Sequence, residues 1–248
     1  MKQAPWRIPL LLTSLVLAAA LLPALPQPQS YHRFVDTRAL LGLPNALNIL
    51  SNLPFLLAGL LGLKILRKGL SKDETGLPYA IFFLALIAVA AGSAGYHIAP
   101  DNARLLGDRL PIAVSLAALL GALLAESGQA RPWTLPWLIA LSLASVLWWA
   151  ISPRWGAETL WPYLAFQLGC MAALLTLAPG VARGGMLLLA LGLYGTALAA
   201  EWMDRAIFAW SGQILSGHSL KHLLAASAAL LVVLRLNLLG NKTPASSR

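Results

Sequence analysis

Residues 75–100 read TGLPYAIFFLALIAVAAGSAGYHIAP and contain no Asp, Glu, Lys or Arg. A helix needs about 20 predominantly apolar residues to cross a hydrocarbon core of about 30 Å. A membrane β-barrel would instead require alternating segments of about ten residues, whereas a continuous apolar run satisfies its own backbone hydrogen bonds as a helix. This stretch therefore predicts a transmembrane helix over residues 77–98.

Similar uncharged runs continue in both directions from this helix. The chain has 248 residues, of which 58% are hydrophobic and 11% charged, and its mean hydropathy is +0.72. Soluble globular domains carry about 25% charged residues. The sequence therefore predicts an all-α, polytopic membrane helix bundle that forms a single integral membrane domain over residues 1–248. We expect eight transmembrane helices, at residues 7–25, 46–66, 77–98, 108–126, 133–151, 159–178, 185–207 and 217–237.

The first of these runs has two interpretations. Lys2 and Arg7 precede its apolar core, as in a signal peptide. Its exit, LPALPQPQS, is rich in proline and lacks a small-x-small cleavage site. We therefore favour an extra, retained N-terminal helix over residues 7–25, ahead of a seven-helix core over residues 46–238.

The net charge of +9 would suggest a nucleic-acid partner in a soluble protein. In a membrane protein the excess of Lys and Arg in cytoplasmic loops explains it better, so no nucleic acid is expected. With a cytoplasmic N-terminus, eleven Lys and Arg fall inside, including Arg235 and the basic run 64–72, and seven fall outside, including Arg109. This bias predicts a membrane protein with both termini on the cytoplasmic side.

Four ionisable residues fall at one depth of the predicted bundle, on its outer side. His97 ends the third span, Asp108 opens the fourth, and His218 and His222 begin the eighth. An ionisable side chain at the centre of a membrane helix costs about 2.5–3.5 kcal/mol on insertion scales, so such residues are rare unless they are paired or functional. Their common depth predicts a site facing the periplasm.

The spacing of these residues favours metal binding. His218 and His222 are four residues apart and share one helix face, and Ser93 lies one turn before His97. Three neutral imidazoles leave one position of a tetrahedral zinc ion open, which is typical of catalytic sites, and Asp108 could orient a ligand or accept a proton. From spacing alone, ordinary hydrogen-bonded histidines remain an alternative.

Other polar residues near this layer receive simpler interpretations. Glu201 and Arg205 are four residues apart and suggest an ion pair on the seventh span. Asp204, on the same turn, is a candidate contact for substrate hydroxyls. Lys221 is expected to extend its ammonium group to the membrane interface.

Three segments together resemble the alkaline ceramidase family. GSAGYHIAPDNARLLGDRLP resembles its Ser, His and Asp-x-Leu-Pro signature, GHSLKHLLA its His-x-x-x-His element, and LNILSNLPFLLAGL its first core helix. The segments occur in the family's order across about residues 36–238. Because order and spacing agree, the resemblance is specific.

The resemblance implies a seven-helix membrane hydrolase of the superfamily that includes adiponectin-type receptors. His97, His218 and His222 would hold zinc, Asp108 would be the general base, and Ser93 would place its hydroxyl near the reacting carbonyl. The expected partner is a ceramide-like membrane lipid, whose amide would be cleaved to a sphingoid base and a fatty acid. Residues 26–45 would lie outside the membrane as a possible cover over the site.

The sequence departs from the family at its calcium site. The family has an acidic cluster before the first core helix, whereas VDTRALLGLPNALN offers Asp36, Asn45 and Asn48 but no glutamate. Calcium takes six to eight oxygen ligands. Calcium therefore remains possible here, but the region has few carboxylates for it.

Two other functions are compatible with the pattern. A receptor-like member of the superfamily would use the same zinc, although the tails are too short for a partner domain. A small-molecule or lipid transporter is the alternative from another class. It is disfavoured because we find no charged residue at the bilayer midplane, no internal repeat and no pair of helices broken by Gly or Pro.

Overall fold

The computed structural model describes residues 5–67 and 74–240. Within these ranges all regular elements are helices, as the sequence predicts, and the only β-type contacts are two isolated bridges. The α-helices are α1 (Arg7–Ala20), α2 (Ala46–Leu50), α3 (Leu53–Ile65), α4 (Gly76–Ile98), α5 (Asn102–Glu126), α6 (Thr134–Ile151), α7 (Trp161–Leu177), α8 (Gly184–Trp202), α9 (Asp204–Trp210) and α10 (Gly217–Gly240). Several charges used above to orient the chain lie outside the described residues, namely Lys2, Lys68, Lys72, Lys242 and Arg248.

Seven helical segments are long and apolar enough to cross a membrane, which indicates an integral membrane protein. They are Ala46–Ile65, Gly76–Ile98, Asn102–Glu126, Thr134–Trp155, Trp161–Gly180, Gly184–Trp202 and Gly217–Gly240. The eighth predicted span, 7–25, is not confirmed, because α1 has only 14 residues and ends at Ala20. Prolines at 23, 26 and 28 follow, and their missing N–H groups prevent a longer helix.

Two other helix boundaries differ from the prediction. α5 begins at Asn102 rather than 108, because Asp101 caps it by accepting a hydrogen bond from the Arg104 N–H. Asp108 therefore lies inside a helix and does not open one. α8 ends at Trp202 rather than 207, and the chain turns at Met203 before α9 begins.

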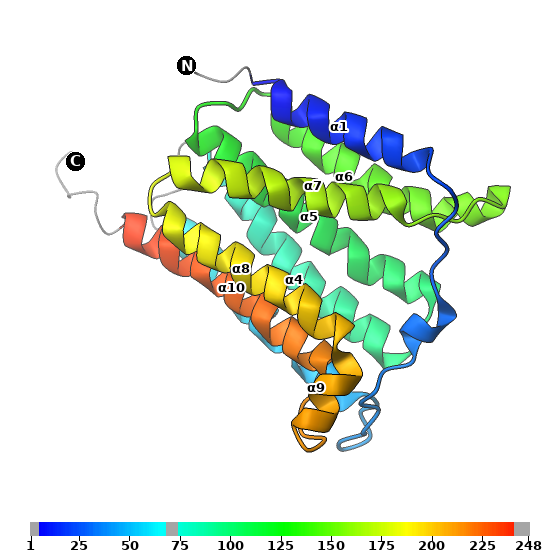
Figure 1. Cartoon of the computed structure of the whole chain (residues 1–248). Helices are drawn as coiled ribbons and strands as arrows, with labels where there is room; N and C mark the ends of the chain where they lie inside the picture. The colour runs from blue at the N-terminus through cyan, green and yellow to red at the C-terminus, as the bar shows by residue number, and fades with distance from the viewer. Residues whose placement is uncertain (1–4, 68–73, 241–248) are drawn as a thin grey trace.

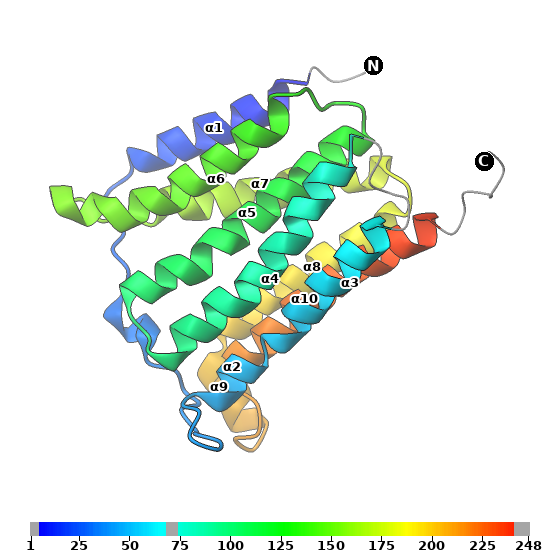
Figure 2. The same cartoon turned by 180° about the vertical axis from the view of Figure 1, so that it is seen from behind.

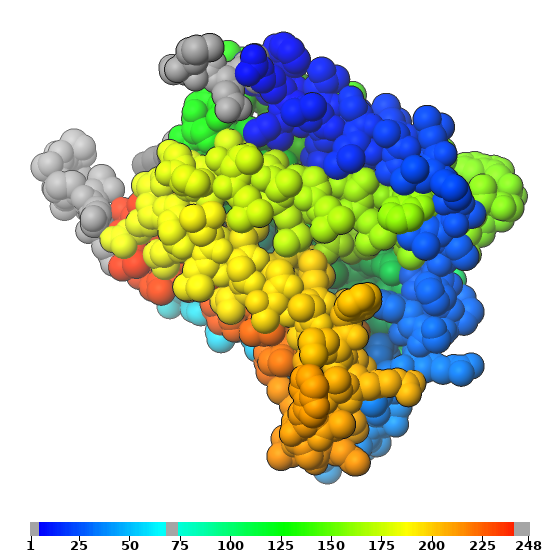
Figure 3. All heavy atoms as spheres, in the orientation of Figure 1, coloured from blue at the N-terminus to red at the C-terminus, as the bar shows by residue number. Residues whose placement is uncertain are grey.

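α4 and α5 pack against each other in the middle of the bundle, and one group of helices lies on each side of them (Figures 1 and 2). α5 contacts α4, α6 and α7, and α1 packs against the outer side of α6 and α7. On the other side, α10 packs against α3 and α8, and α4 joins α3 to α5. α9 projects beyond the ends of the long helices (Figure 3). The end of α4 and the start of α10, which carry the three predicted histidine ligands, lie near α9.

Two glycines allow close contacts between helices at this end of the bundle. A Cβ atom on Gly92 of α4 would overlap the carbonyl oxygen of Gly107 on α5. A Cβ atom on Gly217 of α10 would overlap the carbonyl oxygen of Ala200 on α8. Only glycine permits such an approach of two backbones. The contacts bring α4 against α5, and α10 against α8, next to the predicted site.

The opposite end of the bundle contains a buried ion pair. The Arg235 guanidinium is fully buried and donates to Glu126 Oε2 at 2.5 Å, to the Tyr79 hydroxyl at 2.9 Å and to the Ala182 carbonyl. The sequence-based orientation treated Arg235 as a cytoplasmic loop charge, which is wrong. Arg109, assigned to an outer loop, is likewise buried in α5. Neither charge therefore supports that orientation.

Candidate metal centre

Three of the chain's four histidines come together at the α9 end of the bundle. His97 is in the last turn of α4, and His218 and His222 are in the first two turns of α10. All three side chains are buried, and one ring nitrogen from each lies within 4.8 Å of the other two. The ring centroids are 4.8–5.1 Å apart. The predicted ligand set is thus assembled in space and is positioned to hold a metal ion.

The distance between two of the rings fits a shared tetrahedral ion. His97 Nε2 and His218 Nε2 are 3.3 Å apart. Zn–N bonds of 2.0–2.1 Å at a tetrahedral angle place two ligand nitrogens about 3.3–3.4 Å apart. A single proton shared between these two nitrogens would complete one hydrogen bond. A metal ion could bind both nitrogens and also the ring of His222.

Hydrogen bonds to His222 leave its metal-facing nitrogen free. The Ser51 hydroxyl donates to the Asn48 carbonyl, so its oxygen can accept the Nδ1–H of His222 at 2.8 Å. A proton on Nδ1 leaves Nε2 with its lone pair available to a metal. Ser51 lies at the break between α2, which ends at Leu50, and α3, which begins at Leu53.

A carboxylate lies behind the ring of His218. Glu201 Oε1 lies 3.5 Å from His218 Nδ1, and it also accepts hydrogen bonds from Lys221 Nζ at 2.6 Å and the Tyr31 hydroxyl at 2.9 Å. Burial, aided by the Glu201 charge, raises the pKa of Tyr31 well above its ordinary value, so this phenol remains a donor. A carboxylate behind a ligand histidine fixes its tautomer and increases its basicity.

Two predictions about this carboxylate are wrong. Glu201 does not pair with Arg205, because α8 ends between them and the two residues are not on one continuous helix. Lys221 does not extend to the membrane interface, since its side chain is mostly buried and paired with Glu201. Both side chains belong to the surroundings of the histidine cluster.

Replacing Glu201 by glutamine is expected to weaken zinc binding by about 10-fold to 100-fold, the usual effect of losing such a carboxylate. Glutamine keeps an oxygen for Tyr31 and Lys221 but removes the negative charge behind His218. Chelator competition on the purified protein would measure the change. Glu74→Gln is the control, because Glu74 is exposed before α4. Equal zinc affinity in the Glu201→Gln and wild-type proteins would contradict a role for Glu201 in orienting the ligand.

Ser93 and Asp108 face each other across the contact between α4 and α5. The Ser93 hydroxyl lies close enough to the Asp108 carboxylate to stabilise its charge. Both side chains are buried, and with His222 they line one cavity of about 380 Å³. The remaining wall is mainly apolar, with aliphatic side chains from α4, α5, α7, α8 and α10. The Asp108 carboxylate, which can transfer a proton, thus lies in the wall of a mainly apolar cavity.

The Gly92 contact predicts a sharp difference between two similar substitutions. Gly92→Ala should force α4 away from the Gly107 carbonyl, separate Ser93 from Asp108, and lower both thermal stability and any hydrolytic activity. Gly95→Ala is the matched control on the same helix, because its Cβ would meet no atom within 4 Å. Melting temperatures of the two purified variants would test this. Equal stabilities would contradict the close approach.

The residues considered for calcium make other contacts. The Arg38 guanidinium donates to both Asp36 oxygens at 2.7–2.8 Å, and these hydrogen bonds lower the pKa of Asp36 despite its burial. Asn48 donates to the Asp36 carbonyl and accepts from the Ser219 hydroxyl. Asn45 donates to the His97 carbonyl. Too few free oxygens remain, so these residues do not fit calcium.

Asp204, the remaining candidate, and His32, the fourth histidine, both have partners within the protein. Asp204 Oδ1 accepts the backbone N–H of His218 at 2.8 Å, so this carboxylate fixes the first turn of α10. His32 contacts the Tyr96 hydroxyl through one ring nitrogen and Asn102 through the other, each at 2.9 Å. With both nitrogens engaged, His32 is not a metal ligand.

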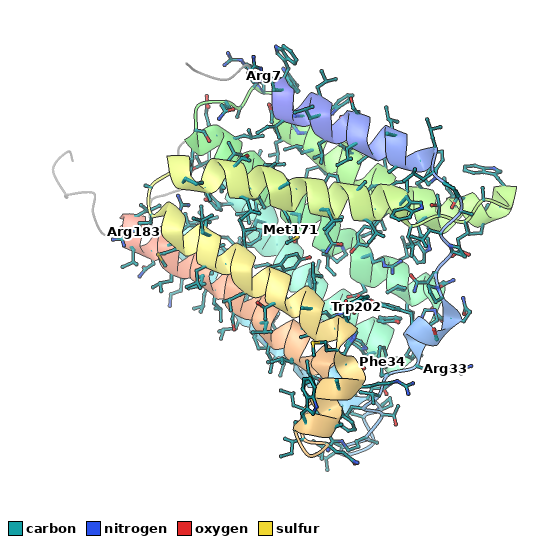
Figure 4. All side chains as sticks on the ribbon, viewed as in Figure 1. Arg7, Arg33, Phe34, Met171, Arg183 and Trp202 are labelled. Carbon is teal, nitrogen blue, oxygen red and sulfur yellow. The ribbon has the colours of Figure 1, made fainter. Side chains whose placement is uncertain are left out.

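The linker between α1 and α2 covers the cluster. Phe34 packs its ring against His97 and His218, with centroids 4.6 and 5.0 Å away. Figure 4 places Phe34 and Trp202 at this end, and Arg7 and Arg183 at the other. Gln27 and Tyr31 line the cavity. Sequence reasoning missed these two residues because the linker contacts depend on a chain path that no local pattern specifies.

The cluster limits which metals could bind. Three neutral imidazoles suit zinc, copper, nickel or iron, and they do not suit magnesium or calcium, which prefer oxygen ligands. The buried Nδ1 of His97 has no hydrogen-bond partner among the described residues, so one polar atom of the cluster is unsatisfied. The donor set is therefore consistent with zinc without identifying it. Comparisons of the chain with family models, curated proteins and solved structures give no match.

Proposed function

We propose that this chain is a zinc-dependent membrane hydrolase of the alkaline ceramidase type, which cleaves the N-acyl bond of ceramide-like lipids. One observation carries the proposal: His222, a member of the buried histidine cluster, lines the same apolar cavity as Ser93 and Asp108. The arrangement of these residues supports metal-assisted hydrolysis as the reaction class. The ceramide-like substrate is inferred from the resemblance to the alkaline ceramidase family. The products would be a sphingoid base and a fatty acid.

The membrane arrangement is part of the same proposal. Seven helices would cross the bilayer as the catalytic core, and α1 would lie outside it as an eighth membrane helix against α6 and α7. Leucines exposed on α1 support this, because they would face lipid; they are Leu10, Leu11, Leu15 and Leu17. The excess of positive charge expected inside would place the histidine end towards the periplasm of a bacterial inner membrane.

The cavity has the size and lining of a lipid site. Its volume of about 380 Å³ lies within the range of ligand pockets, about 300–1,000 Å³. Apolar side chains such as Leu116, Leu174 and Leu187 would contact an acyl chain, and Ser93 and Asp108 would meet the amide. Hydrocarbon burial would thus position the scissile bond beside the polar residues.

A zinc ion held by the three imidazoles would supply Lewis acidity towards the amide carbonyl and make water a better nucleophile at neutral pH. Asp108 would accept a proton from the attacking water as its oxygen bonds to the carbonyl carbon. Protonation changes Asp108 from an acceptor into a donor to Ser93 Oγ. The Ser93 hydroxyl hydrogen is then free to turn towards the carbonyl oxygen.

The second half of the reaction uses the same two side chains. Ser93 would donate to the oxygen that gains negative charge in the tetrahedral intermediate. The C–N bond then breaks, and the proton held by Asp108 passes to the departing nitrogen. The amine and the carboxylic acid leave, and Asp108 is again ionised and bonded to Ser93.

Metal analysis combined with a lipid-amide assay tests the proposal. Purified protein in detergent micelles should contain stoichiometric zinc and hydrolyse ceramide, lose activity on chelation, and regain it when zinc is restored. Zinc without hydrolysis of any lipid amide would contradict the enzyme proposal and favour a receptor-like protein. Solute uptake by vesicles containing the protein, without hydrolysis, would favour a transporter.

A further inference from the structure

Arg109 is a buried cation in the cavity wall that the proposed reaction does not use. It follows Asp108 on α5, and only 7% of its surface is exposed. Among the other ionisable groups in the cavity wall, Lys221 pairs with Glu201. The carboxylates of Asp108 and Glu201 attract Arg109 from a distance, without either one forming an ion pair with it. Within the part of the chain that the structure describes, Arg109 forms no ion pair.

The surroundings of Arg109 fix its position. Its guanidinium carbon lies 4.4 Å from the ring centroid of Trp149, 5.3 Å from that of Tyr163 and 5.6 Å from that of Tyr31. Its Nη2 donates to Gln27 Oε1 at 2.5 Å. Its Nη1 is buried and has no hydrogen-bond partner among the described residues. The cation is thus held in place while part of its donor capacity is unused.

An unpaired buried charge is unfavourable unless a ligand completes its hydrogen bonds. The ligand that best matches a guanidinium is a planar carboxylate, which can accept two parallel N–H groups. A phosphate would bring more oxygens than Arg109 and Gln27 could satisfy within walls formed by aromatic rings. The adjoining aliphatic cavity indicates that the carboxylate belongs to a molecule with an acyl chain.

We propose that Arg109, positioned by Gln27, binds the carboxylate of a fatty-acyl amphiphile in this cavity. The inference rests on the proposed function only in treating the cavity as a lipid site. Two sources of the carboxylate share this chemistry. It could be the fatty acid released by hydrolysis, or an acidic group on the amine half of an N-acylated substrate.

Binding measurements on the Asp108→Asn protein test the inference without turnover. Palmitate, hexadecanol and N-palmitoylglycine would each displace a fluorescent fatty acid from full-length protein in nonionic detergent. Palmitate should bind more tightly than hexadecanol. Arg109→Gln should lower the affinity for palmitate by about 10-fold to 100-fold, as expected for the loss of hydrogen bonds to a charged group. Hexadecanol binding should not change. N-palmitoylglycine binding more tightly than palmitate would assign the site to an acidic substrate, and the reverse order to the released fatty acid.

Matched variants separate binding from folding. Arg104→Gln, on the same helix but exposed, should leave palmitate binding unchanged. If Arg109→Gln does not fold, Gln27→Ala is measured instead. This variant should weaken the binding of palmitate but not that of hexadecanol. Equal affinity of wild-type protein for palmitate and hexadecanol, or palmitate binding unaffected in a folded variant, would overturn the inference. Ceramide hydrolysis is measured separately on the wild-type protein, and its result tests the proposed function alone.

Discussion

Asp108→Asn is expected to retain zinc and to lose ceramide hydrolysis by about 10²-fold to 10⁴-fold, the usual contribution of a positioned general base. Asparagine can still accept a hydrogen bond from Ser93, so the contact between α4 and α5 should persist. It cannot accept a proton from water at neutral pH. The three imidazoles are unchanged, and zinc content should therefore equal that of the wild-type protein. Elemental analysis and a ceramide assay on the same preparation would measure both.

Asp101→Asn is the matched control for that substitution. Asp101 lies seven residues earlier, immediately before the same helix, where its exposed side chain caps α5 and pairs with Arg104. Asparagine is also a good helix cap, so stability and activity should both remain close to wild type. Wild-type turnover by Asp108→Asn would contradict the proposed base. Loss of zinc in that variant would instead place Asp108 among the metal ligands.

The long helices and the histidine cluster follow from the sequence for a physical reason. Lipid offers the backbone no hydrogen bonds, so each apolar run must form a helix, and its length is set by the bilayer. Once the spans are counted, His97, His218 and His222 necessarily fall at one depth. Depth alone does not fix the lateral distance between the histidines, which depends on how α4 and α10 both pack against α3.

Charged side chains with distant partners lie elsewhere than the sequence predicts. The sequence predicts loop positions for Arg235 and Arg109 because an ionisable group usually ends a transmembrane run. Glu126 pairs with Arg235, and Gln27 with three aromatic rings holds Arg109 inside the bundle. Glu201 was assigned a partner on its own helix, whereas its actual partner, Lys221, is on α10. Local spacing carries no information about such pairs.

His218→Ala is expected to remove zinc and with it all hydrolysis. Two imidazoles would remain, and the fourth-position water of a catalytic site needs three protein ligands in place. In the wild-type protein, zinc should also raise the melting temperature, because it binds the folded state and its ligands are assembled only there. That increase should disappear in His218→Ala. Elemental analysis, thermal denaturation with and without zinc, and the ceramide assay would measure the three effects.

His32→Ala distinguishes loss of the metal from loss of any histidine near the site. His32 contacts Tyr96, the residue before His97, but both of its ring nitrogens are engaged away from the cluster. Its removal should lower stability while leaving zinc content and the zinc-dependent rise in melting temperature intact. Full turnover by zinc-free His218→Ala would end the proposal of metal-assisted hydrolysis. Undiminished zinc in His218→Ala would show that the metal is held elsewhere, because two imidazoles cannot replace the three-nitrogen site.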